Sequence, residues 1–420
     1  MKMTMVCTEY PPNYRGGLGI YLERLVTSLK KENHEVEVYA MNYPHALPKR
    51  TVEGSAVINR ISPCSFTRKG LDKYLGKRSL PAILYNAISI AFFNFHAFLK
   101  IRRASKKNDV GVIGIHDWMC IPAALLIHWF TKLDMMFHVH STEMSMNLHQ
   151  TGGVLPRVAA WLENRMKGIA KKVVVPSQEV KVHLIADGWQ PDIIYVVPHG
   201  HEDANLEKVI HASPTKIEAD KLRLRTEWAV DPDTKLIAFA GRLTPHKGIE
   251  TLIDAMATVK SRVGDCKLIV IGSGEEGYQE KLQQRIDSQG LSQHVFAYFQ
   301  QLSQDQVFER LNAVDICVFP SVYEPFGFVA LEAMSLSKPV VLGSGFPTII
   351  KDPKSLNQYP EDTALFAQTD DANEIASHLI ELLNSPEKRS SLGQSAKTYA
   401  LTHFKWSKTA QMTTNVYQTV

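Results

Sequence analysis

Two glutamates in the second half of the chain have residue types and spacing suited to ligand binding. They lie in the segment Ser321-Val-Tyr-Glu324-Pro-Phe-Gly327-Phe-Val-Ala-Leu-Glu332. The apolar run Ile316–Phe319 predicts a strand before this segment, and the residues after Gly327 predict a helix. The free N–H groups at such a helix start, near Phe326, suit a phosphate. Carboxylates repel a phosphate, so we expect Glu324 and Glu332 to accept hydrogen bonds from hydroxyl groups of the same ligand.

Two cations follow an earlier predicted strand, Leu236–Ala240, in the sequence Gly241-Arg242-Leu-Thr-Pro-His-Lys247-Gly248. A helix is predicted from Lys247 to about residue 260. Arg242 and Lys247 beside this helix start are expected to stabilise a diphosphate, including the charge that develops on it as a leaving group. Because two cations supply this stabilisation, the sequence predicts a reaction that needs no metal ion and no cofactor.

Glycine loops after two other predicted strands are further candidates. Gly272 and Gly274 follow the run Lys267–Ile271, and Gly16 and Gly17 follow the run Met3–Cys7. Glycine lets the backbone approach a ligand closely, although each loop is also compatible with an ordinary turn. Arg15 beside the first of these loops adds a positive charge.

Histidines end two predicted strands of the first half. His116 follows the run Val110–Ile115, whereas His138 and His140 close the run Met135–His140, with Glu143 just beyond. His116 and His140 are both candidates for a histidine at the reaction centre, and His116 is preferred. The His-x-His pair also suggests zinc, but no third ligand is evident from the sequence.

Short apolar runs alternate with amphipathic stretches along the whole chain, which predicts parallel sheets covered by helices. A chain of 420 residues is expected to form two domains. The interval from Val197 to Thr234 has no strand pattern, so the domains are predicted as residues 1–205 and 206–400. A helix at about 400–420 is expected to pack back on the first. The predicted fold class is α/β, with two Rossmann-like domains facing each other across a cleft lined by the glycine loops.

The composition is that of an ordinary soluble protein, with 45% hydrophobic and 21% charged residues. A formal net charge of +4 gives no reason to expect a nucleic-acid partner. The five scattered cysteines favour reduced thiols, and the N-terminus lacks the pattern of a signal peptide. A cytoplasmic location is therefore predicted.

The uncharged segment Leu80–Leu99 is the exception to this plain composition. At about 20 residues it is long enough to cross a bilayer, but it contains polar residues such as Asn86 and Asn94. A buried helix is the favoured interpretation. Basic flanks leave open a peripheral membrane contact through residues 68–107, and a membrane-spanning helix is the third alternative.

The motifs taken together resemble those of the retaining GT-B glycosyltransferases of family GT4. The segment from Glu324 to Glu332 resembles the E-x7-E motif of that family, and the loop from Gly241 to Gly248 resembles its G-R-x-x-x-x-K-G motif. His116-Asp117-Trp118 is similar to the H-D-W of its glycogen-synthase-type members. The sequence departs from the family at His246, at Pro198-His199-Gly200 and at Gly343-Ser344-Gly345-Phe346.

The resemblance implies a GT-B fold and the transfer of a hexose from a nucleoside-diphosphate sugar (UDP-, GDP- or ADP-hexose) to an acceptor hydroxyl. The transfer is expected to retain the anomeric configuration by a front-face mechanism. The residues expected at the reaction centre are His116, Arg242, Lys247 and Glu324. Those expected to bind the donor are Gly16, Gly17, Arg242, Lys247, Gly272, Gly274, Glu324, Phe326, Gly327 and Glu332.

Arg15, His140 and Glu143 are the candidates for acceptor binding, and the sequence does not identify the acceptor or the oligomeric state. A nucleotide-sugar epimerase of the same fold and a sugar-nucleotide binding protein without catalysis are the alternatives. A carboxylate pair by itself would also fit a glycosidase. The placement of Glu324 and Glu332 around a helix start, together with two cations, favours binding of a donor instead.

Overall fold

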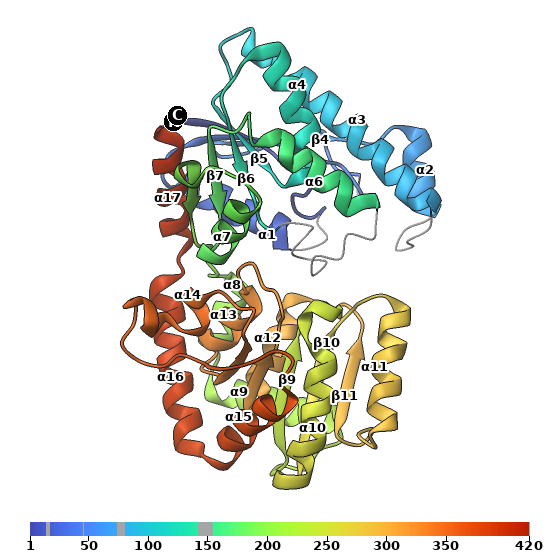
Figure 1. Cartoon of the computed structure of the whole chain (residues 1–420), viewed down its shortest axis with the longest axis vertical. Helices are drawn as coiled ribbons and strands as arrows, with labels where there is room; N and C mark the ends of the chain where they lie inside the picture. Colours follow the sequence, from blue (N-terminus) through green and yellow to red (C-terminus); the bar gives the residue numbers. More distant parts are fainter. Residues whose placement is uncertain (14–16, 45, 74–79, 142–153, 420) are drawn as a thin grey trace. The chain divides into compact units, whose positions relative to one another are not determined.

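A computed structural model describes residues 1–13, 17–44, 46–73, 80–141 and 154–419 (Figure 1). The chain forms two compact units. Unit 1 comprises Met1–Gly200 and Trp406–Val420, and unit 2 comprises His201–Lys405. The C-terminal helix α17 (Trp406–Gln418) is therefore part of the N-terminal unit.

Unit 1 is built on an eight-stranded sheet with the order β3-β4-β2-β1-β5-β6-β7-β8. All neighbouring strands are parallel except β3 and β4, which form an antiparallel pair at one edge. The sequence interpretation did not include this pair, since β3 is a short and largely exposed edge strand. The strands are β1 (Lys2–Val6), β2 (Glu35–Met41), β3 (Arg50–Glu53), β4 (Ala56–Ile61), β5 (Val112–His116), β6 (Met135–His138), β7 (Lys172–Val175) and β8 (Ile194–Val196).

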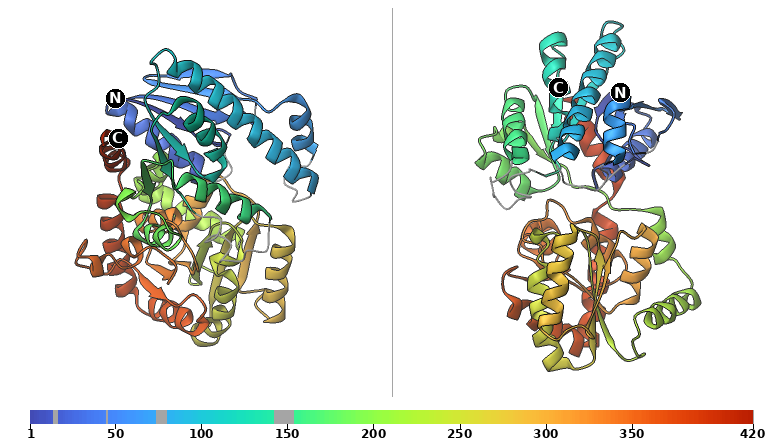
Figure 2. Two further views of the ribbon diagram at one scale, coloured as in Figure 1. Left: turned by 45° about the horizontal axis from the view of Figure 1, so that its top comes forward. Right: turned by 90° about the vertical axis from the view of Figure 1, so that its right-hand side faces the viewer.

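The helices of unit 1 cover this sheet (Figure 2). Their apolar stripes follow the helical period, as in α1, where Leu22, Leu25 and Leu29 are fully buried. The elements are α1 (Gly17–Lys31), α2 (Ser65–Lys73), α3 (Leu80–Ser105), η1 (Trp118–Cys120), α4 (Ile121–Thr131), α6 (Val154–Met166), α7 (Gln178–Ala186) and η2 (Pro191–Ile193), with α17.

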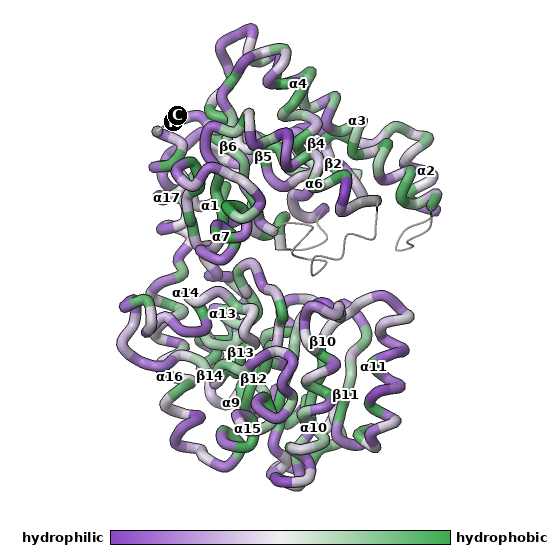
Figure 3. Tube along the Cα trace, in the orientation of Figure 1, coloured by the Kyte–Doolittle hydropathy of each residue, from purple (hydrophilic) through white to green (hydrophobic). Residues whose placement is uncertain are grey.

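Unit 2 contains a six-stranded, all-parallel sheet with the order β11-β10-β9-β12-β13-β14. The strands are β9 (Lys235–Ala240), β10 (Cys266–Gly272), β11 (Val295–Phe299), β12 (Ile316–Phe319), β13 (Val340–Gly343) and β14 (Leu365–Ala367). Their apolar runs form the centre of the core, which Figure 3 shows in green, whereas much of the outer helix α11 is purple. A parallel sheet buried on both faces explains why these strands read as continuous apolar runs.

The helices of unit 2 include two, α8 and α9, in the interval where no strand was predicted. The elements are α8 (Ala204–Ile210), α9 (Pro214–Glu227), η3 (Pro245–Lys247), α10 (Ile249–Val263), α11 (Glu276–Ser288), α12 (Gln304–Ala313), α13 (Phe328–Ser335), α14 (Thr348–Lys351), η4 (Pro353–Leu356), α15 (Ala372–Asn384) and α16 (Pro386–His403). The helix predicted from Lys247 begins at Ile249, because Gly248 has a left-handed backbone with φ 69°.

Two predictions need correction. The strand predicted to end at His140 ends at His138, so His140 lies on the following loop. The helix predicted for Leu80–Leu99 forms, but the prediction that it is buried is wrong for much of its length. Helix α3 is long and apolar enough to cross a membrane by length and composition alone, and only 33% of its most apolar window is buried.

Candidate functional site

The charged candidates of unit 2 lie on three loops at the carboxyl ends of neighbouring strands. These loops, called the charged loops below, are Gly241–Gly248 after β9, Gly272–Gly274 after β10 and Pro320–Gly327 after β12. Strand β9 lies between β10 and β12, so the order of the strands reverses beside it. Open parallel sheets bind ligands at such a reversal.

Backbone contacts hold the three charged loops together. The N–H of Val322 donates to the carbonyl of His246 (2.8 Å), and the N–H of Leu243 donates to the carbonyl of Ser273 (2.9 Å). A Cβ atom at Gly248 would overlap the carbonyl of Pro320, and one at Gly274 would overlap the carbonyl of Leu243. Glycine at these positions is therefore required for loop packing, whether or not a ligand is bound.

Lys247 and Glu324 form an ion pair in which the Nζ of Lys247 donates to the Oε2 of Glu324. Both side chains are largely buried, with exposed fractions of 14% and 12%. Glu324 is fixed further by its N–H, which donates to the carbonyl of Gly345 (3.1 Å). Two residues taken separately from the sequence thus meet directly, and each has remaining hydrogen-bonding capacity for a ligand.

His246 is buried beside the two cations of this loop. Burial, with smaller contributions from Lys247 and Arg242, lowers the pKa of His246 to about 4. The histidine is therefore neutral at physiological pH and adds no charge to the loop. Arg242 is exposed, so its guanidinium is accessible to solvent and to an anion.

Helix α13 begins at Phe328, directly after the loop that carries Glu324. Gly327 precedes it with φ 107°, and no side chain caps this end of the helix. A Cβ atom at Gly327 would lie 2.6 Å from the ring of Phe346, which comes from the loop after β13. Phe326 is buried, so only its backbone groups remain for ligand contact at this helix start.

Glu332 lies on α13 without a partner for its carboxyl group among the residues that the structure describes. Burial raises the pKa of Glu332 to about 8, and the nearby carboxylate of Asp203 adds to this effect. Asp203 caps helix α8 by accepting from the N–H groups of Asn205 and Leu206. A half-buried carboxyl group with unused acceptor capacity is suited to hydroxyl donors of a ligand.

Unit 1 carries a different group of side chains at the carboxyl ends of its own strands. His116 and His138 are register partners on β5 and β6, and both are fully buried. Together with His140 and His199 they form what we call the histidine cluster. The Nδ1 of His116 lies 3.3 Å from the Nε2 of His140, and the Nε2 of His138 lies 2.9 Å from the hydroxyl of Tyr417.

Aromatic rings enclose the histidine cluster. The ring of Tyr21 lies 4.5 Å from that of His140 and 4.3 Å from that of His199, and the ring of Trp406 stacks at 6.5 Å on His199. Burial lowers the pKa of every histidine in the cluster, and that of His140 falls to about 3. The cluster is thus a polar but uncharged group near neutral pH.

The structure supplies the third imidazole that a zinc site would need, because nitrogen atoms of His116, His138 and His140 lie within 4.8 Å of one another. The orientation of the rings is unfavourable, however. The rings of His116 and His138 stack face to face, with centroids 4.2 Å apart and an interplanar angle of 22°. The lone pairs of stacked rings run parallel instead of converging on one ion, so this orientation of the rings does not favour a zinc ion.

Three sequence candidates, Arg15, Gly16 and Glu143, lie outside the described residues. Gly17 is exposed at the start of α1. Asp117, between His116 and Trp118, has an unusual φ of 68° and accepts from the N–H of Trp118 (2.6 Å).

The sequence analysis did not select Tyr21, Trp406 or Tyr417, and it noted His199 only as a departure from the family pattern. These four residues come from three distant stretches of the chain. The signal that could have found His199 was its place directly after a proline that follows a strand.

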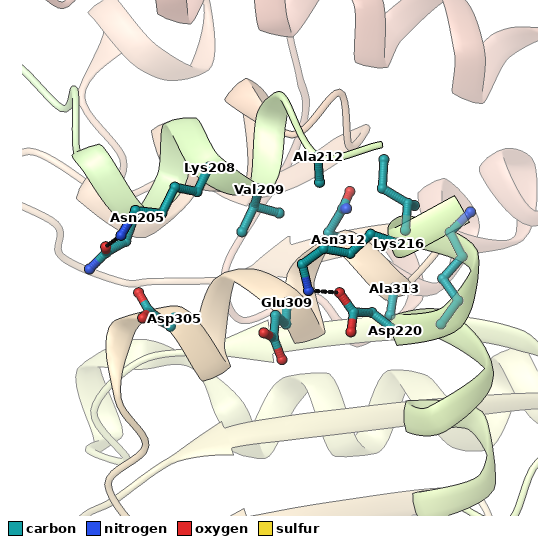
Figure 4. A pocket seen from close by; sticks show the side chains of 12 residues that line it. Asn205, Lys208, Val209, Ala212, Lys216, Asp220, Asp305, Glu309, Asn312 and Ala313 are labelled. Atoms are coloured by element: carbon teal, nitrogen blue, oxygen red, sulfur yellow. Dashed lines mark hydrogen bonds and ion pairs between the residues drawn. The ribbon is translucent and has the colours of Figure 1, made fainter. Parts of the chain in front are cut away.

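A cavity of about 130 Å³ opens among α8, α9 and α12 in unit 2 (Figure 4). The predicted site residues do not line it. Of its charged side chains, Lys216 pairs with Asp220 (2.9 Å), and Lys208 donates to the amide oxygen of Asn205 (2.9 Å). Lys221 and Glu309 pair with residues outside the lining, Glu218 (2.9 Å) and Arg223 (2.7 Å). Most of the charges are thus already paired, which gives no indication of a charged ligand.

Comparison with known proteins agrees with the arrangement of the charged loops. Residues 15–204 match the family described as Glycosyltransferase Family 4, and residues 220–399 match the family described as Glycosyl transferases group 1. The chain belongs to glycosyltransferase family 4. The two matched segments together cover most of the chain.

Relatives of similar length support the same family. An uncharacterized glycosyltransferase of Methanocaldococcus jannaschii is 27% identical, with 100% of this chain and 98% of the relative covered. The alpha-maltose-1-phosphate synthase of Mycobacterium tuberculosis is 25% identical over the full length of both chains.

Solved structures share the fold. Sucrose-phosphate synthase from Thermosynechococcus elongatus has a TM-score of 0.73 at 20% identity, covering 100% of this chain and 98% of that one. The Anabaena protein HepE, in complex with UDP and glucose, has a TM-score of 0.70 at 20% identity over both full chains. These neighbours are GT-B glycosyltransferases, so the family 4 chain has the GT-B fold.

Proposed function

We propose that this family 4 glycosyltransferase moves a hexose from a nucleoside-diphosphate sugar to an acceptor hydroxyl with retention of configuration and without a metal ion. The observation that carries the proposal is the contact between Lys247 and Glu324 on the charged loops. It places a cation suited to a phosphate beside a carboxylate suited to a sugar hydroxyl. The HepE structure, with UDP and glucose bound, supports a donor of this class.

In the proposed reaction, the bond between the anomeric carbon and the diphosphate oxygen breaks. Lys247, Arg242 and the N-terminus of α13 stabilise the negative charge that moves onto the diphosphate. The acceptor oxygen forms its bond to the anomeric carbon on the same face, and its proton passes to the departing diphosphate. Glu324 holds hydroxyls of the hexose, and Glu332 accepts hydrogen bonds from the ribose.

The proposed role of the histidine cluster is to hold the acceptor beside the reacting sugar, with His116 preferred over His140 for direct contact. A neutral imidazole can accept a hydrogen bond from a hydroxyl or donate one to it. Neither the epimerase nor the non-catalytic alternative is favoured, because the named relatives are transferases and synthases and because Lys247, Arg242 and Glu324 are all present.

Slow donor hydrolysis tests the proposal without knowledge of the acceptor. The protein is incubated with UDP-, GDP- and ADP-glucose, and the freshly released sugar is followed by NMR. The expected product is the α-anomer of glucose, with an unchanged rate after EDTA treatment. Release of the β-anomer would exclude retention, loss of activity with EDTA would exclude metal independence, and binding without turnover of any donor would favour a non-catalytic protein.

A further inference from the structure

Helix α3 exposes apolar side chains where a surface helix normally exposes polar ones. Every exposed residue between Leu80 and Phe95 is apolar. The exposed positions, called the outward stripe below, are Leu80, Pro81, Ile83, Leu84, Ala87, Ile88, Ala91 and Phe95. They recur every three or four residues and therefore lie on one face of the helix. Over about 16 residues this face is roughly 24 Å long.

Two polar side chains of the same helix are buried. Ser89 and Asn94 are each 1% exposed. The amide of Asn94 donates to the carbonyls of Ile90 (2.8 Å) and Met119 (2.9 Å) and accepts from the N–H of Ala123 (2.9 Å). Because Asn94 caps the junction of η1 and α4, the helix cannot rotate its outward stripe into the core without breaking these bonds.

The core of unit 1 already uses the inner face of α3. Phe93, Ala97 and Ile101 are almost completely buried in it. Exposure of the outward stripe is large by comparison, reaching 80% at Leu80 and 57% at Leu84. Contiguous apolar surface of this kind marks an interaction site on a folded protein.

Helix α4 lies beside α3 and extends this surface (Figure 2). Trp129 and Phe130, near its C-terminus, are exposed. The ring of Phe130 packs on that of Phe98 from α3 (5.5 Å), and the guanidinium of Arg102 lies 5.5 Å from the ring of Phe130. Aromatic rings next to basic side chains are typical of the interface between a membrane and water.

Charge at this surface identifies the partner. In the described residues 64–73 and 80–108, the basic residues are Arg68, Lys69, Lys73, Lys100, Arg102, Arg103, Lys106 and Lys107, and Asp72 is the only acidic one. Helix α2 carries Arg68, Lys69 and Lys73 and lies against α3, where Gly70 of α2 packs directly on the ring of Tyr85. A second copy of the chain would bring positive charge against positive charge. An anionic lipid surface offers the complement.

We propose that unit 1 docks on a membrane that contains anionic phospholipids. The outward stripe enters the boundary between head groups and acyl chains, and the flanking lysines and arginines contact the phosphates. Helix α3 lies along the surface instead of spanning the bilayer, since its opposite face is fixed in the core through Asn94 and Phe93. This inference does not depend on the proposed transferase reaction.

Flotation of the full chain with vesicles tests the proposal. We expect binding to vesicles of phosphatidylcholine with about one third phosphatidylglycerol, little binding to phosphatidylcholine alone, and weaker binding at high salt. The variant Leu84→Gln/Ile88→Gln should bind at least about tenfold more weakly because it loses apolar burial. The variant Lys100→Gln/Arg103→Gln should bind about 30-fold more weakly because it loses two cations.

Matched controls lie outside this surface. Val182→Gln/Leu222→Gln changes two apolar residues that are 53% and 67% exposed, against 57% and 38% for Leu84 and Ile88, and Lys216→Gln/Lys221→Gln removes two lysines of α9. Both controls should bind like the unmodified chain, and all four variants should unfold at the same temperature. Failure of the unmodified chain to float with anionic vesicles would overturn the proposal, as would equal binding by the stripe variant and its control. A dimer that Leu84→Gln/Ile88→Gln converts to a monomer, without vesicle binding, would assign the surface to a second copy instead.

Discussion

The two units place side chains of opposite character at the same position in their sheets. In unit 2, the loops at the carboxyl ends of the strands carry Lys247, Glu324 and Arg242, and helix α13 adds the half-buried carboxyl group of Glu332. In unit 1, the corresponding edge carries the histidine cluster, whose members are neutral because burial lowers their pKa values. Similar backbones thus create one site that uses ionic charge and one that uses uncharged hydrogen-bonding groups.

This difference matches the two kinds of substrate in the proposed reaction. A nucleoside-diphosphate sugar carries charge that must be balanced, and its hydroxyls need acceptors. A hydroxyl acceptor is uncharged before transfer and needs orientation more than charge. Under the proposed function, unit 2 supplies donor affinity and unit 1 positions the acceptor, and each role can be tested separately.

The largest effect is expected from Lys247→Ala. This variant removes a cation from the leaving diphosphate and leaves Glu324 largely buried without its partner. Turnover of the nucleotide sugar, followed by release of the nucleoside diphosphate, should fall about a hundredfold to a thousandfold. Arg262→Ala, an exposed arginine at the end of α10, is the control and should keep full activity. Equal rates for both variants would remove Lys247 from the site.

The second-largest effect is expected from a change in side-chain packing in unit 1. A Cβ atom at Gly114 on β5 would overlap the hydroxyl of Tyr417 on α17, so Gly114→Ala should lower the free energy of unfolding by about 2 kcal/mol. Tyr417→Phe alone should cost about 1 kcal/mol through the lost contact with His138. Because the phenylalanine also removes the overlapping atom, the double variant should lose less than the sum of both changes.

Denaturant titration of these variants measures the coupling. Gly168→Ala serves as the control, since an added Cβ there meets no atom within 4 Å. Additive losses in the double variant would mean that Tyr417 does not lie against Gly114 in solution.

The pH dependence of nucleotide binding should show the charge state of Glu332. With a pKa of about 8, its carboxyl group is mostly protonated at neutral pH in the free protein. Hydroxyl donors favour the carboxylate, so binding releases a proton, and affinity should rise with pH from 6 to 8 by up to about tenfold per unit. Calorimetry of UDP, GDP and ADP across this range measures the slope.

Glu332→Gln should bind the nucleotide more weakly and remove the pH dependence. Glu280→Gln, an exposed residue of α11, should keep the wild-type slope. A slope that persists in Glu332→Gln would assign the proton to another group.

The smallest effect is expected from a single change in the histidine cluster. Histidines with lowered pKa values bind fewer protons in the folded chain than in the unfolded chain. The contribution of these histidines to the free energy of unfolding is therefore fully present above the ordinary imidazole pKa of about 6.5, and it decreases as the pH falls below that value. His116→Asn should reduce the slope of stability against pH. The reduction should correspond to less than one proton, which is at most about 1.4 kcal/mol per pH unit, because the four histidines of the cluster share the proton uptake.

Thermal unfolding at pH 7 and pH 5 measures this change. His183→Asn, on α7 away from the cluster, should leave the decrease in stability unaltered. An unchanged decrease in His116→Asn would indicate that the cluster does not limit acid stability.

The sequence alone determined most strands of the two sheets, though not β3, β4 or β14, together with the helix that carries Glu332 and the loops that carry Arg242, Lys247 and Glu324. These features depend on local patterns: an apolar run, a glycine and the polar residues just after it. The contact of Lys247 with Glu324 across 77 positions was not predicted, because only the structure shows that β9 and β12 are neighbours in the sheet.

Only the tertiary structure decided which distant side chains completed the histidine cluster. The contact between His138 and Tyr417 spans 279 positions and depends on how α17 packs on β5 and β6. Likewise, the apolar composition of α3 predicted a buried helix, but hydropathy does not say which face of a helix turns inward. The hydrogen bonds of Asn94 to Met119 and Ala123 fix this side chain in the core, and the apolar side of the helix therefore faces outward.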